Sequence, residues 1–235
     1  MKRPIIIGIG GSHSKSGKTS LAVALLNRLE GWGAIKYTKT AIYSSIIEDG
    51  DILSVKGKDT RRFMDSGAKA VLWVQSPASG LNEVMPLAMD KLSHLEGIIV
   101  EGNSAIEFLK PDIIIFIAEK DSSRIKESGK RILDSADIIY YSDKKEIMVR
   151  QAHHEIERGN RIINGEIETV ASIVFGMIDL MKRVEKLLVE NALNGRIPCS
   201  LARRIAEDMG VSYKKIGEIA DEIGIKITNC ELGCF

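Results

Sequence analysis

GGSHSKSGKTS, at residues 10–20, lies between two apolar segments, PIIIGIG at 4–10 and SLAVALLNRLE at 20–30. The first segment has the composition of a buried strand, and the second has the apolar spacing of a helix. A loop between a strand and a helix directs successive backbone N–H groups toward one point, where the helix dipole also favours negative charge. The order strand, glycine-containing loop, helix therefore predicts a binding site for a polyphosphate.

The loop ends in Gly17-Lys18-Thr19, which is the end of the phosphate-binding pattern G-x-x-x-x-G-K-[ST]. In that pattern the lysine reaches the β- and γ-phosphates and the hydroxyl ligates Mg²⁺, and we assign these roles to Lys18 and Thr19. Ser12 stands in the place of the first glycine. His13 is expected to shape the loop or to contact a neighbouring subunit. The predicted nucleotide-binding residues are Gly11, Ser12, His13, Ser14, Lys15, Ser16, Gly17, Lys18, Thr19 and Ser20.

Strand and helix patterns alternate over the first ~165 residues, which predicts an α/β fold with a mainly parallel sheet covered by helices on both faces. The candidate strands are 4–9, 33–37, 70–75, 97–101, 112–118 and 137–141. The candidate helices are 18–29, 60–66, 82–95 and 123–135. Ligands of such sheets bind beyond the carboxyl ends of the strands, which is where the 10–20 loop lies.

Two acidic residues are candidates for the chemistry of this edge. Glu101 ends the apolar run in LEGIIVEGNSA and is predicted to hold Mg²⁺ through water, together with Thr19. Asp59, in GKDTRR at 57–62, has two interpretations. It caps the helix that follows, or it orients Mg²⁺ or the attacking water while Lys58 and Arg61 add charge near the phosphates. The catalytic candidates are Lys18, Asp59 and Glu101. Lys36 and Thr38 are strand-end polar residues that face a ligand or the surface.

Four segments occur in an order that resembles the molybdopterin-guanine dinucleotide biosynthesis protein B family. They are SHSKSGKTSL, GAIKYTKT, VKGKDTRRFMDSGAKAVLWVQSP and LEGIIVEGNSA, and the resemblance covers residues 4 to 145. It implies a P-loop nucleotide-binding fold and a nucleoside triphosphatase accessory to molybdenum cofactor biosynthesis. It also implies that a molybdopterin-type small molecule or a partner enzyme takes part.

The identity of the base and of any acceptor is left open by the sequence. EKDS at 119–122 is a weak match to the guanine-binding pattern N-K-x-D, so both ATP and GTP remain candidates. KDSSRIKESGKR at 120–131 resembles the basic lid of a small-molecule kinase, which makes a kinase the alternative enzyme, although a solvated helix face explains the same charges.

Length and composition limit the number of domains and the kinds of partner that the chain can have. The 235 residues allow one α/β domain and a small second one, and a net charge of +1 indicates neither a nucleic-acid nor a membrane surface. The longest apolar runs are too short to span a bilayer. We expect a cytoplasmic protein whose three cysteines are reduced.

The alternation of strands and helices stops after Gly165, and the predicted domains are 1–165, a connecting helix at 166–193 and a small module at 194–235. The long helix is continuous or has a break near Gly176. RIPCSLARRIAEDMGVSYKKIGEIADEIGIKI at 196–227 fits a helix-turn-helix, with Gly210 at the turn, and the tail resembles winged-helix modules. Its basic and acidic residues are nearly balanced, so dimerisation or protein docking is favoured over DNA binding, and a homodimer is expected.

Two further groups were considered as metal ligands. Cys199, Cys230 and Cys234 would provide three thiolates for zinc or an iron–sulfur cluster, but small buried thiols are the preferred interpretation. His153 and His154 are adjacent in sequence and therefore point in different directions on a helix, which favours surface roles.

Overall fold

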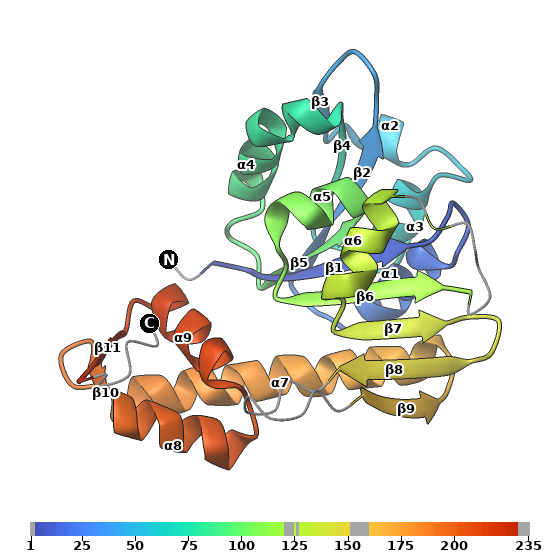
Figure 1. Cartoon of the computed structure of the whole chain (residues 1–235). Coiled ribbons are helices and arrows are strands. Elements are labelled where there is room, and N and C mark those ends of the chain that lie inside the picture. Colours follow the sequence, from blue (N-terminus) through green and yellow to red (C-terminus); the bar gives the residue numbers. More distant parts are fainter. Residues whose placement is uncertain (1–2, 120–124, 126, 151–159, 230–235) are drawn as a thin grey trace. The chain divides into compact units, whose positions relative to one another are not determined.

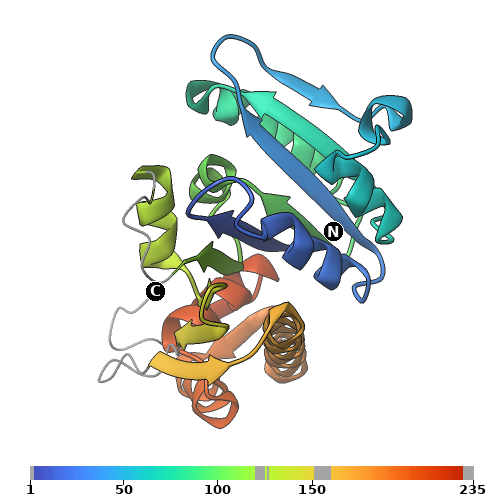
Figure 2. The same cartoon turned by 90° about the vertical axis from the view of Figure 1, so that its right-hand side faces the viewer.

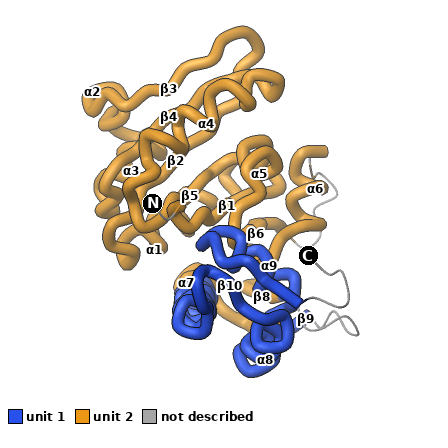
Figure 3. Tube along the Cα trace, turned by 90° about the vertical axis from the view of Figure 1, so that its left-hand side faces the viewer, with its two compact units in different colours: residues 1–2, 150–161, 172–235 blue, residues 3–149, 162–171 orange. Residues whose placement is uncertain are grey.

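The computed structural model describes residues 3–119, 125, 127–150 and 160–229 of the chain. The chain divides into two compact units, which are coloured separately in Figure 3. The larger unit comprises Arg3–Val149 and Ile162–Ala171. The smaller unit contains, among the described residues, 150, 160–161 and 172–229. The predicted phosphate loop and both candidate carboxylates belong to the larger unit.

The larger unit is built around a sheet with the strand order β3-β4-β2-β5-β1-β6-β7-β8-β9 (Figure 1). The strands are β1 Ile5–Gly11, β2 Trp32–Lys39, β3 Ser45–Ile47, β4 Val71–Ser76, β5 Gly97–Glu101, β6 Ile113–Ala118, β7 Ile138–Tyr141, β8 Glu146–Arg150 and β9 Asn160–Asn164. The run from β4 to β7 is parallel, whereas β3 and β8 join it antiparallel. Each predicted strand coincides with one of the parallel strands, which confirms the mostly parallel α/β architecture.

Helices cover both faces of this sheet, as the sequence predicted. They are α1 Lys18–Leu26, α2 Gly50–Leu53, α3 Asp59–Asp65, α4 Leu81–Lys91, α5 Asn103–Leu109 and α6 Glu127–Ser135, with a short 3₁₀ turn at Ala78–Gly80. Figure 2 shows α1 and α3 on one side of the sheet and α4, α5 and α6 on the other. The central strands are therefore enclosed, and Ile7, Ile99 and Ile115 are fully buried.

Three local features differ from the sequence prediction. Helix α1 ends at Leu26, three residues before the expected end at 29. Helix α5 begins directly after β5, because Gly102 turns the chain in a single residue with φ 140°. The outer strands β3, β8 and β9 had no counterpart among the predicted elements, since each is short and β3 and β9 lack fully buried residues.

The smaller unit holds most of the long helix α7 and a pair of short helices. Helix α7 runs from Ile167 to Asn191 without a break, and α8 Cys199–Met209 and α9 Tyr213–Glu222 follow. Gly210 ends α8 in the left-handed conformation, and the expected anchors Ala206, Ile216 and Ile219 are buried in one apolar cluster. This helix, turn, helix arrangement matches the pattern in the sequence.

Two short strands complete the described part of the tail. Strands β10 Arg196–Pro198 and β11 Lys226–Thr228 pair in parallel. Cys199 is a buried free thiol, consistent with its packing role. Cys230, Cys234, His153 and His154 lie outside the described residues.

Candidate functional site

The parallel register of three strands brings the candidate residues to one edge of the sheet. Ile9 of β1 and Lys36 of β2 both pair with Glu101 of the intervening strand β5. The phosphate loop continues from β1, so it emerges beside the carboxylate that ends β5. The proximity of loop, Glu101 and Lys36 follows from strand order and could not be read from any one of the motifs alone.

The loop between β1 and α1 has the backbone of an anion-binding nest. Lys15 has φ 71°, and Gly17, directly before α1, has φ 100° and ψ 4°, so two residues of the loop have the positive φ that occurs in such nests. The N-cap of α1 is Gly17, so no N-cap side chain accepts from the first N–H groups of the helix. A Cβ at Gly11 would overlap Ser16 Oγ and approach Lys18 Cδ to 3.1 Å, so a larger residue there would displace these loop side chains.

The ammonium of Lys18 lies folded over this loop. Its Nζ donates to the carbonyl oxygen of His13 at 2.7 Å and to Ser16 Oγ at 3.1 Å. Both acceptors are loop atoms, so the cation stays above the nest where phosphate oxygens would replace them. His13 Nδ1 lies 2.6 Å from the Ser14 carbonyl oxygen, to which it donates in the tautomer that carries the proton on Nδ1, and Nε2 lies 3.4 Å from Glu119 Oε1. Both contacts agree with a role in shaping the loop.

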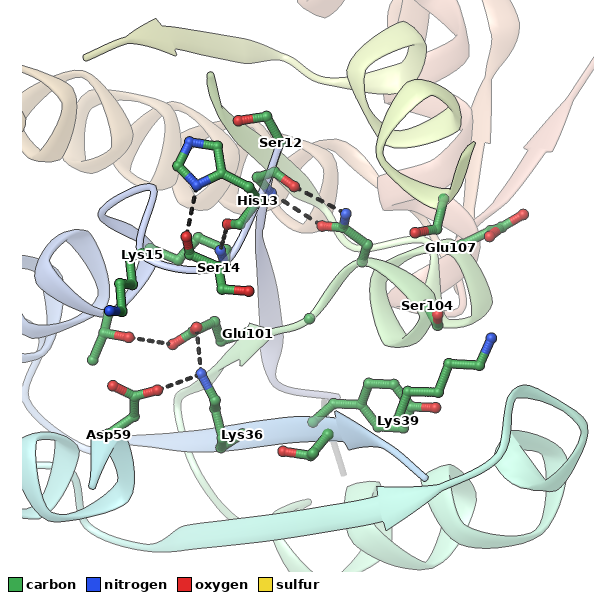
Figure 4. A pocket seen from close by; sticks show the side chains of 18 of the residues that line it. Ser12, His13, Ser14, Lys15, Lys36, Lys39, Asp59, Glu101, Ser104 and Glu107 are labelled. Atoms are coloured by element: carbon green, nitrogen blue, oxygen red, sulfur yellow. Dashed lines mark hydrogen bonds and ion pairs between the residues drawn. The ribbon is translucent and has the colours of Figure 1, made fainter. Parts of the chain in front are cut away.

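A charged cluster lies next to the start of α1 (Figure 4). Thr19 Oγ1 donates to Glu101 Oε2 at 3.0 Å, and Lys36 Nζ lies 2.5 Å from Glu101 Oε1 and 2.6 Å from Asp59 Oδ2. The Glu101 side chain is only 2 % exposed. Burial would lower the pKa of Lys36, but the two carboxylates outweigh it and the pKa is raised. Burial likewise opposes ionisation of Asp59, but Lys36, Thr19 and Arg62 hold its pKa below the ordinary value.

These shifts predict how the Lys36–Asp59 pair depends on pH. The contribution of Asp59 is present above its ordinary pKa of 3.8 and is lost as the pH falls through the lower folded value. The contribution of Lys36 is present below 10.5 and is lost only as the pH rises through the higher folded value. The difference in unfolding free energy between wild type and Asp59→Asn should therefore stay constant from about pH 5 to about pH 9. Urea unfolding at several pH values measures it, and a decline within this window contradicts the pairing.

Asp59 does not cap a helix, although a local rule predicted that it would. Helix α3 begins at Asp59 itself, its N-cap is Lys58, and no side chain caps it. The carboxylate instead contacts the Lys36 ammonium.

Lys58 and Arg61 do not lie where the sequence analysis expected them, near the phosphates. Arg61 pairs with Asp65 at 2.9 Å, and the Lys58 ammonium lies 4.6 Å from the centre of the Trp73 ring. Neither lines the cleft, whereas Arg62 does. The Thr38 hydroxyl accepts from Trp73 Nε1 at 3.0 Å.

Asn103 is a site residue for which the sequence motifs gave no role. Its Oδ1 accepts from the Gly11 N–H and its Nδ2 donates to the Gly11 carbonyl, both at 3.0 Å. The side chain thereby satisfies both backbone groups at the junction of β1 and the loop, and fixes the start of the nest. Its position directly after the Glu101-Gly102 turn was the available signal, because that turn returns the chain to the loop.

Removal of the Asn103 amide should loosen the loop. Asn103→Ala leaves the Gly11 N–H and carbonyl without these partners, which is expected to cost about 1–3 kcal/mol of stability. Asn103→Asp keeps the acceptor and loses the donor, so its stability should lie between that of wild type and that of Asn103→Ala. Thermal unfolding of both variants tests this, with the exposed Asn82→Ala on α4 as the control. An Asn103→Ala protein as stable as the control contradicts the clamp.

These residues line one cleft of about 1420 Å³ in the larger unit (Figure 4). All the predicted nucleotide-binding residues line it except Ser16, which lies beneath the Lys18 ammonium. Ser12 is fully buried, and its Oγ has no hydrogen-bond partner within the described structure. The cleft extends beyond Asp59 and Glu101 to a second end. This end is lined by Lys39, Ser104, Glu107, Phe108 and Arg131.

The oxygens of Thr19, Glu101 and Asp59 fit Mg²⁺, which prefers hydroxyl, carboxylate and phosphate oxygens and retains several waters. Among the residues that the structure describes, no group of three or more His, Cys, Asp or Glu side chains is arranged to hold a metal ion.

Three basic side chains of the helix pair in the smaller unit have partners within the pair. Lys214 and Lys215 lie 3.7 and 3.6 Å from the carboxylate of Glu218, and Arg203 stacks on the Tyr213 ring at 5.0 Å.

Comparison of the chain with protein-family models finds no matching family, and comparison with curated proteins finds no matching relative. None of the helices in the described parts of the chain is both long and apolar enough to cross a membrane.

Proposed function

We propose that the larger unit binds a Mg²⁺–nucleoside triphosphate in the cleft and hydrolyses it slowly. The convergence of Lys18, Thr19 and buried Glu101 at one sheet edge carries the proposal. The loop N–H groups and Lys18 hold the β- and γ-phosphates, while Thr19 and Glu101 hold the metal, the latter through water. Bound Mg²⁺ neutralises charge that develops on the phosphates. Asp59 lies at the same cluster and is the candidate for orienting the attacking water.

Binding is tested by calorimetric titration of the full chain with ATP and with GTP, each with Mg²⁺ and with a chelator. At least one triphosphate should bind, and more tightly with Mg²⁺, because Thr19 and Glu101 would hold the metal next to the phosphates. Release of inorganic phosphate then measures turnover. If neither nucleotide binds in either condition, the assignment of the loop to nucleotide is wrong.

We further propose that this nucleotide chemistry serves molybdenum cofactor biosynthesis, with a molybdopterin-type molecule or a partner enzyme as the second component. The support is the order of the four sequence segments, from SHSKSGKTSL to LEGIIVEGNSA. Mass spectrometry of the small molecules that co-purify with the protein tests it. A pterin compound beside the nucleotide supports the proposal, and a reproducible second ligand of another class contradicts it.

A small-molecule kinase is the second candidate, and the size of the cleft favours it. About 1420 Å³ exceeds the roughly 300–1,000 Å³ typical of a pocket for one ligand. The end lined by Lys39, Phe108 and Arg131 leaves room for an acceptor beside the triphosphate. Phosphate release without any acceptor favours the triphosphatase. Transfer of labelled γ-phosphate to a small hydroxyl compound of a cell extract favours the kinase.

A further inference from the structure

The ammonium of Lys36 occupies the centre of the oxygens that the proposed function assigns to the metal and its water. It lies 2.5 Å from Glu101 Oε1 and 2.6 Å from Asp59 Oδ2, while the other Glu101 oxygen accepts from Thr19. Figure 4 shows the Lys36 and Asp59 side chains directed toward Glu101. A cation supplied by the chain itself thus takes the position where a divalent ion would meet the same carboxylates.

The fold makes this placement obligatory. Lys36 and Glu101 are register partners on the adjacent parallel strands β2 and β5. The Lys36 side chain is 19 % exposed and that of Glu101 is 2 % exposed, so bulk water compensates neither charge well. Removal of the ammonium would leave two carboxylates facing one point, and such a pair attracts a divalent cation strongly.

Like charge makes the ammonium and a free metal ion competitors for this point. A divalent ion that approaches Glu101 and Asp59 meets the ammonium at close range, beside a carboxylate that is only 2 % exposed, so water screens their repulsion poorly there. A triphosphate changes the balance, since its oxygens add negative charge and supply ligands that the protein does not provide. With the two carboxylates and the phosphate oxygens as partners, the cleft can then hold the metal and the ammonium at the same time.

We propose that Lys36 is a positioning residue that neutralises the metal carboxylates in the nucleotide-free protein, so that a divalent ion binds with the nucleotide and not alone. This inference rests on the proposed function for the identity of the metal oxygens. Lys36 would thereby set the order of binding. Its ammonium holds the Glu101 and Asp59 carboxylates in place until the nucleotide and the metal bind together.

The test is the binding of Mn²⁺ alone to the nucleotide-free full chain, measured by electron paramagnetic resonance. Wild type should bind Mn²⁺ weakly, and Lys36→Met should bind it at least tenfold more tightly. Lys36→Arg keeps the charge and should behave as wild type. Lys91→Met, which breaks an exposed lysine–glutamate pair with Glu48, is the matched control and should show no gain. The double variant Lys36→Met/Glu101→Gln should lose the gain.

A folded Lys36→Met protein with the Mn²⁺ affinity of wild type overturns the inference, as does the same gain in Lys36→Arg. If Lys36→Met does not fold, an experiment on the wild-type protein tests the inference instead. Its lysine side chains are labelled with ¹⁵N, and the Lys36 ammonium signal is followed by nuclear magnetic resonance. Low concentrations of Mn²⁺ alone should leave this signal unbroadened, and strong broadening overturns the inference.

The nucleotide titrations separate this inference from the proposed function. A chain that binds no nucleotide, but whose Lys36→Met variant gains the Mn²⁺ site, disproves the nucleotide assignment and leaves the charge compensation standing. A chain that binds Mg²⁺–nucleotide, but whose variant gains nothing, disproves the role of Lys36 alone.

Discussion

Lys18→Ala should weaken triphosphate binding by about 30-fold or more while leaving the fold intact. The ammonium lies over the nest and its partners are the His13 carbonyl and Ser16 Oγ, both of which belong to the loop. A buried, hydrogen-bonded charge pair that loses one member typically costs about 2–5 kcal/mol, and each 1.4 kcal/mol is a factor of ten in affinity. The variant removes only the side chain that meets the phosphates, so the sheet and α1 keep their packing.

Calorimetry with Mg²⁺ and with the nucleotide that wild type prefers measures this loss. Lys69→Ala is the control, because Lys69 is exposed and does not line the cleft. Circular dichroism and the unfolding midpoint should match wild type for both variants. An Lys18→Ala protein with wild-type affinity would show that the loop does not cradle phosphate, however well its backbone resembles a nest.

The strands of the parallel sheet, and the loop between β1 and α1, were predictable because their signals are local. Runs such as IIIFIA in β6 are buried on both faces, and composition alone identifies strands of that kind. The pattern Gly17-Lys18-Thr19 is likewise recognised from three consecutive residues, and the prediction of a phosphate site depends on it. Helix α5 was missed because it has only seven residues and starts through one glycine at positive φ, which the sequence pattern does not distinguish from a loop.

The charged cluster was harder to predict because it depends on register and competition. Asp59 satisfied the local rule for a cap, but an ammonium 2.6 Å away attracts its carboxylate more strongly than a backbone N–H would. Lys36 reaches it only because β2 and β5 are neighbours, and no residue spacing shows which strands become neighbours.

Helical spacing explains why Arg62 rather than Arg61 reaches the cleft. Residues three apart on a helix share a face, so Arg62 lies on the side of α3 that carries Asp59. Arg61 is turned about 100° away from each of its neighbours and pairs with Asp65 one turn later at 2.9 Å. The sequence prediction placed Lys58 and Arg61 near the phosphates as one group of charges, without assigning each residue of 57–62 to a face of the predicted helix.

Glu101→Gln is expected to raise the Mg²⁺ concentration needed for nucleotide hydrolysis by about 5- to 150-fold. Glutamine keeps the shape of the side chain and can still accept from Thr19, but it carries no charge for the metal. The loss of one charged, hydrogen-bonded partner beside an ion that is largely removed from water costs about 1–3 kcal/mol, which corresponds to that range. Thr19→Ala should act in the same direction, since it removes the direct ligand.

The measurement is a Mg²⁺ titration of phosphate release at saturating nucleotide, with Glu48→Gln, from the exposed pair with Lys91, as the control. Stability must be followed in parallel, because Glu101→Gln also leaves Lys36 with Asp59 as its single carboxylate partner. If the Glu101→Gln titration coincides with wild type, another carboxylate serves the metal. Asp59, already linked to Glu101 through the Lys36 ammonium, is then the group that holds it, and Asp59→Asn should produce the shift instead.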